Sequence, residues 1–341
     1  MSSSAITSGM LIFFGSVVVL IFGQYILIPL IAAVLVYFLI RYITKLFDRI
    51  TFIRDKVAMW IKNIIATFIL FSIAGAVLRL IVYNFDNLIR KFPSYQTNVE
   101  SILHTINDTF GIDLILSITE SLNDLNLADI ANTAFNSLTT IFGNALMITF
   151  YVVFLFIEQS NFKTKIRLLF KGERLTSILD LLSDTEHSVS QYIGLKTVIS
   201  LLTGAASYIV LLSFGVESAL FWAFLIFILN YIPYVGSLAA VLFPFLFSLI
   251  QFGEFTNPLI MLFILGSIQM TIGNFIEPKV MGDLLNISPI VALVSLAFWG
   301  SIWGIVGMFI SVPVTVILII ALAKIPKTRP IAILLSQNGR V

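Results

Sequence analysis

A charged triplet interrupts the apolar second half of this sequence, in the stretch NFIEPKVMGD at residues 274–283. Glu277, Pro278 and Lys279 follow directly on one hydrophobic run, and Lys196 stands near the start of another. Ionisable side chains in or beside a membrane are costly, so they commonly mark a substrate or ion pathway. We therefore predict that Glu277 and Lys196 are functional, and that Glu277 is coupled to Lys196 or to Lys279.

Two of the apolar segments also carry polar or small residues at helical spacing. The first stripe is Lys196, Ser200, Thr203 and Ser207. The second stripe is Gly266, Gln269, Gly273 and Glu277. Such residues often serve only to pack membrane helices closely, and we favour that interpretation for the glycine series Gly300, Gly304 and Gly307. For the charged members of the stripes we favour a functional role.

Helix-breaking residues interrupt the apolar runs at defined points. In NYIPYVGS, Pro233 and Gly236 should break a helix, so that Asn230, Tyr231 and Tyr234 can present polar groups to a substrate. Pro278 is expected to stop a helix just after Glu277 and to free backbone carbonyls there. The candidate substrate pathway is Lys196, Ser200, Thr203, Asn230, Tyr231, Pro233, Tyr234, Gly236, Gln269, Asn274, Glu277, Pro278, Lys279, Trp299, Gly300 and Gly304.

The residue types argue against most other kinds of chemistry. The chain has no cysteine, and its two histidines, His104 and His187, stand in separate regions and are expected on solvated faces, so we predict no metal site and no cofactor. The motifs of zinc proteases, serine hydrolases and nucleotide-binding loops are absent, which favours a protein that is not an enzyme. A net charge of +2 indicates no nucleic-acid partner.

Composition places these residues in a lipid bilayer. Hydrophobic residues make up 59% of the 341 positions and charged residues only 11%, which predicts an all-α, polytopic membrane protein. The N-terminus lacks the features of a cleaved signal peptide and is expected to be retained as a membrane segment. Residues 10–40 read as two short helices or one broken helix, interrupted by Gly23, Gln24 and Pro29.

Charge clusters predict how the segments are oriented, because loops rich in lysine and arginine stay in the cytoplasm. Basic residues are concentrated at 41–62 and 163–174, whereas 84–140 carries mostly acidic charge and is expected outside. The predicted parts are membrane scaffold helices at 1–83, an outer helical region at 84–140, a span at 141–157, a cytoplasmic amphipathic region at 158–191, transport repeats at 192–258 and 259–323, and a cytoplasmic tail at 324–341.

The outer region has the pattern of amphipathic helices. Its apolar stripes are Val99, Ile102, Leu103, Ile106 and Phe110, and then Leu114, Ile118, Leu122 and Leu125. Asn126 is a predicted N-cap of a helix that continues into the span at 141–157. A helical cap or subunit contact is the favoured role of this region, and gating of the substrate is the alternative.

The second half contains an internal repeat. Each unit consists of one full span, at 194–214 and 259–276, followed by two shorter apolar pieces joined by NYIPYVGS or by WGSIWG. The pieces 219–229 and 289–298 are too short to cross a bilayer about 30 Å thick, so both units should form re-entrant hairpins. Counting crossings from the basic loops makes the units inverted repeats with both termini in the cytoplasm, and paired broken segments of this kind point to a transport site.

These motifs carry a family resemblance. LNYIPYVGS, GNFIEPKVMG and SLAFWGSIWGIVGMFISVPVTVIL, preceded by SVSQYIGLKTVISLLTG and followed by PIAILLS, resemble the autoinducer-2 exporter family of bacterial membrane proteins. The match is dense at 188–336 and general before it. The resemblance implies a bacterial inner-membrane transporter that exports small signalling molecules, or in some members exchanges cations for protons. It also implies a homo-oligomer, with a pentamer suggested.

We therefore expect a secondary transporter that exports a small polar signal or metabolite by alternating access, with protons or sodium as candidate coupling ions. A sodium or lithium/proton antiporter is the alternative, although no buried aspartate pair supports it. From a different class, a non-transporting membrane scaffold would use the outer helices rather than the hairpins.

Overall fold

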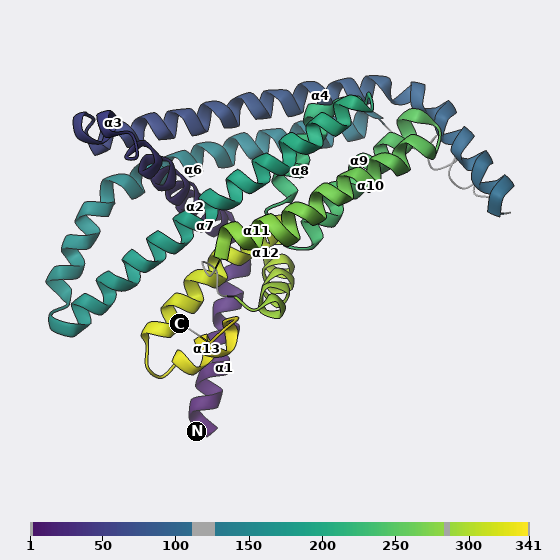
Figure 1. Cartoon of the computed structure of the whole chain (residues 1–341). Coiled ribbons are helices and arrows are strands. Elements are labelled where there is room, and N and C mark those ends of the chain that lie inside the picture. Colours follow the sequence, from purple (N-terminus) through teal and green to yellow (C-terminus); the bar gives the residue numbers. More distant parts are fainter. Residues whose placement is uncertain (1–2, 111–126, 283–286, 340–341) are drawn as a thin grey trace. The chain divides into compact units, whose positions relative to one another are not determined.

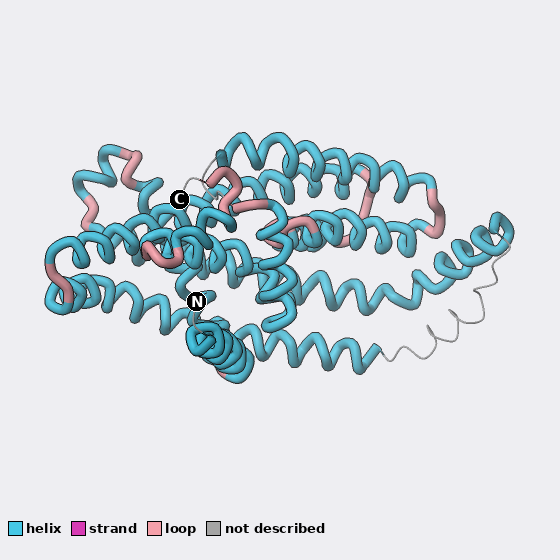
Figure 2. The backbone as a smooth tube through the Cα atoms, turned by 90° about the horizontal axis from the view of Figure 1, so that it is seen from below, coloured by secondary structure: helices cyan, strands magenta, loops and turns pink. Residues whose placement is uncertain are grey.

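The computed structural model describes residues 3–110, 127–282 and 287–339, and this part of the chain consists of helices and short connections (Figure 2). The elements, labelled in Figure 1, are α1 (Ser3–Phe22), α2 (Gln24–Phe47), α3 (Thr51–Lys56), α4 (Met59–Phe110), α6 (Leu127–Leu169), α7 (Gly172–Ser213), α8 (Ala219–Leu229), α9 (Val235–Phe252), α10 (Thr256–Thr271), the π-helical turn η1 (Ile272–Ile276), α11 (Glu277–Met281), α12 (Pro289–Lys324) and α13 (Arg329–Leu335). The all-α prediction is confirmed.

Six helices among the described residues are long and apolar enough to cross a membrane, as far as length and composition decide. They comprise α2, the first part of α4 (Met59–Val77), α7, α9, the run Thr256–Met281 and α12. A further pair within α6, Asn144–Gln159 and Asn161–Leu169, passes the same test with a bend of 51° between its halves. The chain is therefore a multi-pass membrane protein.

The first apolar run forms two helices, and the break lies at Gly23 rather than at Pro29. Gly23 separates α1 from α2, while Pro29 is buried inside α2. Pro29 stands in the second turn of α2, and the helix continues through it although proline removes one backbone donor. Asn126 and the second apolar stripe, Leu114 to Leu125, lie outside the described residues; α6 runs on from Leu127 through the predicted span.

The chain divides into two compact units. Unit 1 comprises Met1–Ala66, Phe142–Leu195 and Met281–Val341, and unit 2 comprises Thr67–Ile141 and Lys196–Val280. The boundary between these units does not coincide with the boundary between the predicted repeats. Unit 2 contains the first hairpin and most of both full spans, whereas unit 1 contains the second hairpin. The inverted relation of the repeats stays a prediction.

In unit 2, α8 and α9 form the first predicted helical hairpin, which packs against α10 (Figure 1). Its core includes Ala223 and Ile226 of α8, Ala240 of α9 and Met261 of α10, all buried. Residues 235–237 are helical, so α9 has 18 residues and begins inside the predicted break NYIPYVGS. By length alone, α9 can cross a membrane, whereas the 11-residue α8 cannot.

In unit 1, α12 contains the second helical hairpin. The backbone leaves helical geometry at Trp303 (φ −125°, ψ 17°) and Gly304 (φ 58°, ψ −139°). The two arms fold back on each other, because Ser295 Oγ before the turn donates to the carbonyl of Ser311 after it at 3.1 Å. Trp303 Nε1 donates to the carbonyl of Leu20, which joins this turn to α1.

Candidate functional site

The polar stripe of α7 is buried within unit 2. The exposed fractions of Lys196, Ser200, Thr203 and Ser207 are 5%, 0%, 0% and 2%. The hydroxyl of Thr203 donates a hydrogen bond to the carbonyl of Ile199 in the same helix. Buried polar groups without a partner are strongly unfavourable, so the remaining members of the stripe should be bonded to neighbouring elements.

Asn230, in the turn of the first hairpin, is the hydrogen-bond partner of Ser200. Its Nδ2 donates to Ser200 Oγ at 3.1 Å, and its Oδ1 accepts from Gln269 Nε2 at 3.1 Å. One buried amide thus connects α7, the hairpin turn and α10. Beside it, the hydroxyl of Tyr231 donates to Thr197 Oγ1 at 2.6 Å.

Lys196 and Glu277 form an ion pair at the other end of this group of residues. Lys196 Nζ contacts Glu277 Oε1, and the exposed fractions of the two side chains are 6% and 23%. Of the two expected partners of Glu277, the structure places Lys196 in contact with it, whereas Lys279 is exposed; the functional coupling stays a prediction. We use the name polar cluster for Lys196, Thr197, Ser200, Asn230, Tyr231, Gln269 and Glu277.

Asn230 is held in position because the backbone of the turn between α8 and α9 packs closely on itself. Val235 begins α9 after Pro233 and after Tyr234, whose φ of 59° is rare for a residue with a side chain. A Cβ on Gly236 would lie 1.8 Å from the carbonyl oxygen of Leu229, so only glycine fits there. Tyr234 itself is 53% exposed and has no part in the polar cluster.

Pro278 does not stop the helix, contrary to the prediction. It lies in α11, which continues to Met281, and the helix adjusts upstream instead through the π-helical turn η1. There the backbone N–H of Glu277 donates to the carbonyl of Ile272, five residues earlier. Such a wide turn accommodates a proline, which has no N–H and collides with the carbonyl four residues before it.

Several sequence-predicted residues lie outside the polar cluster. Asn274, Pro278 and Lys279 are exposed on η1 and α11. A Cβ on Gly266 or Gly273 would meet open space, so these glycines do not mark a close helix contact. Trp299, Gly300 and Gly304 belong to the second hairpin in unit 1, where the rings of Trp299 and Trp303 stack at 5.2 Å.

Sequence reasoning missed some of the polar contacts. Thr197 was not singled out, although it directly follows Lys196, and its partner Tyr231 is distant in sequence. Ser295, Ser311 and Thr315 were also missed; they bond one another inside the second hairpin. Their i, i+4 spacing in ISVPVTV gives a weak signal for the last two only.

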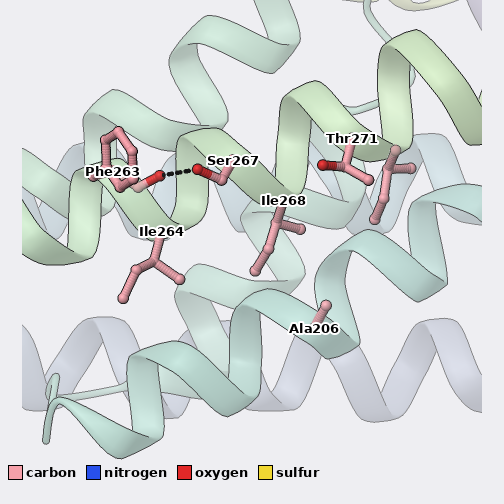
Figure 3. A pocket seen from close by; sticks show the side chains of 7 residues that line it. Ala206, Phe263, Ile264, Ser267, Ile268 and Thr271 are labelled. Atoms are coloured by element: carbon pink, nitrogen blue, oxygen red, sulfur yellow. Dashed lines mark hydrogen bonds between the residues drawn. The ribbon is translucent and has the colours of Figure 1, made fainter.

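An open groove of about 380 Å³ lies on the same helices as the polar cluster but has a different character. Figure 3 shows Ala206 of α7 opposite Phe263, Ile264 and Ile268 of α10. Ser267 in its wall donates to the carbonyl of Phe263 in its own helix at 2.8 Å. The groove is thus apolar, and the polar cluster remains the better candidate for handling a polar solute.

No metal centre accompanies these residues in the described ranges, which contain no group of three or more His, Cys, Asp or Glu side chains placed to hold an ion. The histidines are exposed, His104 on α4 and His187 on α7. The polar cluster therefore offers one ion pair, two amides and hydroxyl groups. Those groups are suited to binding and release of a solute or a proton.

Comparison with known proteins gives a consistent family. The model of the AI-2E family transporters matches residues 9–327. A putative transport protein of Borreliella burgdorferi is 35% identical over 69% of this chain and 65% of its own length. The AI-2 transport protein TqsA of Escherichia coli K12 is 31% identical over 84% of this chain and 85% of its own, and a putative transport protein of Haemophilus influenzae is 30% identical over 80% and 82%.

Proposed function

We propose, from the premise that this chain belongs to the AI-2E family of transporters, that it is a secondary transporter which exports a small polar solute across a bacterial inner membrane. Family membership makes the chain a transporter and displaces the scaffold alternative. The solute, the direction and the mechanism of alternating access are our proposal. The observation that carries it is Asn230, a buried amide in a broken hairpin that bonds to both neighbouring spans.

The position of Asn230 supports a binding role more than a packing role. Helix packing in membranes needs only small residues and single hydrogen bonds between helices. Asn230 instead lies where a helix is interrupted, which is where transporters expose backbone and side-chain groups to their cargo. Its two partners, Ser200 and Gln269, lie on different helices, so a relative movement of α7 and α10 would free its donor and its acceptor.

The chemistry of the polar cluster indicates the class of solute. Ser200, Asn230, Tyr231 and Gln269 offer uncharged donors and acceptors, which suit a solute carrying hydroxyl or carbonyl groups. One relative carries AI-2 transport in its name. We propose an AI-2-like signalling molecule as the first solute to test.

The ion pair favours a second candidate function, in which a proton or a sodium ion is exchanged. Glu277 is 23% exposed and holds the buried ammonium of Lys196, so protonation or cation binding at its carboxylate would break the pair. Ion-coupled export of a solute would use the breaking of this ion pair, and so would cation/proton antiport. The two functions differ in whether the ion flux requires the solute.

Proteoliposomes containing the full chain provide the test. We expect release of AI-2 from loaded vesicles to depend on an imposed proton or sodium gradient. Asn230→Leu, which keeps the volume and removes both hydrogen bonds, should slow release by about tenfold or more, because an amide contact contributes about 1–3 kcal/mol when its partners are left unpaired.

Ser267→Ala is the matched control, since Ser267 lies on α10 two residues from Gln269 and bonds only within its own helix. Release from this variant should stay near the wild-type rate. Ion flux without any solute would support the antiporter instead. Equal rates for wild type and Asn230→Leu would refute the proposed pathway.

A further inference from the structure

A second pocket, unconnected with the proposed transport role, lies in unit 1. It has a volume of about 420 Å³ and a mostly polar lining. Arg41 and Lys45 reach it from α2, Lys163 from α6, and Ser183 and His187 from α7. Two carboxylates, Asp184 and Glu186, complete the wall.

The carboxylates of this pocket are already neutralised. Glu186 Oε1 accepts from Arg41 Nε at 2.8 Å, with Nη2 of the same guanidinium also at 2.8 Å. Asp184 Oδ2 lies 2.7 Å from Lys324 Nζ of α12. Both acids are thereby engaged, and neither is available to the other cations of the pocket.

Lys45 and Lys163 therefore remain as uncompensated charges. Within the described residues, neither has a carboxylate at ion-pair distance. Four cations, Arg41, Lys45, Lys163 and Lys324, stand against the two carboxylates, which leaves a surplus of two positive charges. Ser183 and His187 are one helical turn apart on α7 and add a hydroxyl and an imidazole N–H beside those charges.

The pocket lies where membrane spans end. Lys45 is in the last turn of α2 and Lys324 is in the last turn of α12, and both helices are candidate spans. Side chains at such positions are at the level of lipid headgroups. The surrounding basic residues favour the cytoplasmic surface, which carries anionic lipids.

We propose that this pocket binds a phosphate group, held by Lys45 and Lys163 and completed by Ser183 and His187. A phosphate offers three or more acceptor oxygens and a negative charge, so it matches two ammonium groups and neighbouring neutral donors. The group comes from an anionic phospholipid headgroup or from a soluble phosphate. Because the pocket joins α2, α6 and α7, its occupation stabilises the packing of these three helices.

The test uses the full chain in nanodiscs of phosphatidylcholine, with phosphatidylglycerol added to the lipid in one arm and inorganic phosphate added to the buffer in the other. Thermal unfolding is followed in each. We expect phosphatidylglycerol, phosphate or both to raise the unfolding midpoint of the wild type, since a ligand that binds only the folded state stabilises it. A response to lipid alone identifies the headgroup as the source, and a response to phosphate alone identifies the soluble ion.

The double variant Lys45→Gln, Lys163→Gln should lose this response, with affinity reduced by about tenfold or more through the loss of two charge-assisted hydrogen bonds. Lys171→Gln, Lys327→Gln is the control, because it removes the same charge from exposed positions outside the pocket. The single variant Lys163→Gln serves if the double variant is unstable. An equal response in wild type, variant and control, or no response of the wild type to either addition, would overturn the proposal.

Discussion

At the scale of single residues, the ion pair of Lys196 and Glu277 places two charges inside an apolar part of the protein. Lys196 is almost completely buried in an apolar helix, where an unpaired ammonium is far more costly than in water. Glu277 remains partly exposed, so solvent or an ion can reach one side of the pair. The arrangement gives the buried lysine a counter-charge while leaving its partner accessible.

We predict that breaking this pair from one side destabilises the protein more than removing it completely. Glu277→Gln leaves the ammonium of Lys196 without its counter-charge, which for a fully buried pair costs about 3–5 kcal/mol. The cost here should be lower, because Glu277 is 23% exposed. Thermal unfolding should show a lower midpoint for Glu277→Gln, and partial recovery for Lys196→Met combined with Glu277→Gln.

The pair Lys165 and Glu158 is a suitable control, because its side chains are 63% and 48% exposed. Glu158→Gln should leave the unfolding midpoint close to that of the wild type, because an exposed ion pair contributes little to stability. Additive effects of the Lys196 and Glu277 substitutions on stability and on transport would contradict the proposed coupling.

At the scale of elements, each hairpin contains a glycine that the backbone of the opposite arm or turn requires, whereas Gly300 is required less strictly. A Cβ on Gly236 would meet the carbonyl oxygen of Leu229 at 1.8 Å, and one on Gly307 would meet that of Trp299 at 1.8 Å. A Cβ on Gly300 would instead meet the flexible side chain of Met308 at 3.0 Å. Backbone contacts cannot move aside without opening the turn, whereas a methionine side chain can.

Gly236→Ala should therefore lower the unfolding midpoint and abolish most transport, while Gly300→Ala should have a mild effect. Gly266→Ala provides the comparison, since its Cβ would meet nothing within 4 Å. Alanine is a better helix former than glycine by about 1 kcal/mol, so this variant should be neutral or slightly more stable. The packing argument fails if Gly236→Ala unfolds no earlier than Gly266→Ala.

The extension of α4 past its apolar part is fastened to the base of the first hairpin. Tyr95 OH donates to Glu217 Oε2 at 2.7 Å, and Lys91 Nζ lies 3.0 Å from the same oxygen. Asn98 Nδ2 donates to the carbonyl of Gln251 at 2.7 Å. These contacts give the predicted outer region a positioning role for the hairpin within unit 2.

We predict that Tyr95→Phe with Asn98→Ala increases amide hydrogen exchange at the two ends of the α8–α9 hairpin, because each lost hydrogen bond contributes about 1 kcal/mol. Thr105→Ala, which loses only a bond within α4, should leave exchange unchanged. Unaltered exchange in the double variant would show that α4 does not hold the hairpin.

The same contact has a defined pH dependence. Burial, and then the neighbouring Glu217, raise the pKa of the Tyr95 phenol above its ordinary value near 10. The neutral phenol is favoured in the folded state, so its stabilising contribution is complete below pH 10 and is lost as pH rises through the folded-state pKa. Tyr95→Phe should remove this part of the alkaline decline in the unfolding midpoint.

At the scale of the whole molecule, the two proposed sites belong to different units of the chain. Unit 2 contains the polar cluster and the first hairpin, and unit 1 contains the second hairpin and the phosphate pocket. Because both units are assembled from several distant chain segments, each span contributes to the packing of residues far from it in sequence. The absence of cysteine in the chain makes labelling experiments straightforward.

The basic residues at 324–329 predict a cytoplasmic C-terminus. A C-terminal fusion to green fluorescent protein should fluoresce, and a fusion to alkaline phosphatase should be inactive, because the first matures in the cytoplasm and the second only outside it. An active phosphatase fusion would contradict the predicted inverted-repeat topology.

Both hairpin turns are further predicted to be accessible to water during transport. Single cysteines placed at 230–235, at 237 and at 299–304 should react with a small aqueous thiol reagent, and added solute should slow the reaction. A cysteine at Met270, an exposed apolar position of α10 that does not line the groove, is expected to face lipid and to react slowly. Uniformly slow labelling at both turns would argue against a solute pathway through them.

The sequence by itself determined the features that depend on neighbouring residues. Runs of apolar residues predicted the membrane helices, and the interrupted runs predicted both hairpins, because helix breaking at Pro233 or Gly304 is a local backbone property. The polar stripe of α7 was also recognisable from its helical spacing, and the cost of a charge in lipid singled out Lys196 and Glu277, although Lys279 remained a second possible partner of Glu277. The motifs identified the family.

Only the tertiary structure decided which distant groups meet. The register of α7 against the hairpin and α10 gives Asn230 both of its partners and brings Tyr231 to Thr197, and no local pattern contains that register. The helix continues past Pro278 because the backbone widens into a π-helical turn just before it, a change of hydrogen bonding that the proline itself does not predict. The phosphate pocket arises where α2, α6 and α7 converge, since charges far apart in sequence become neighbours only when the helices pack.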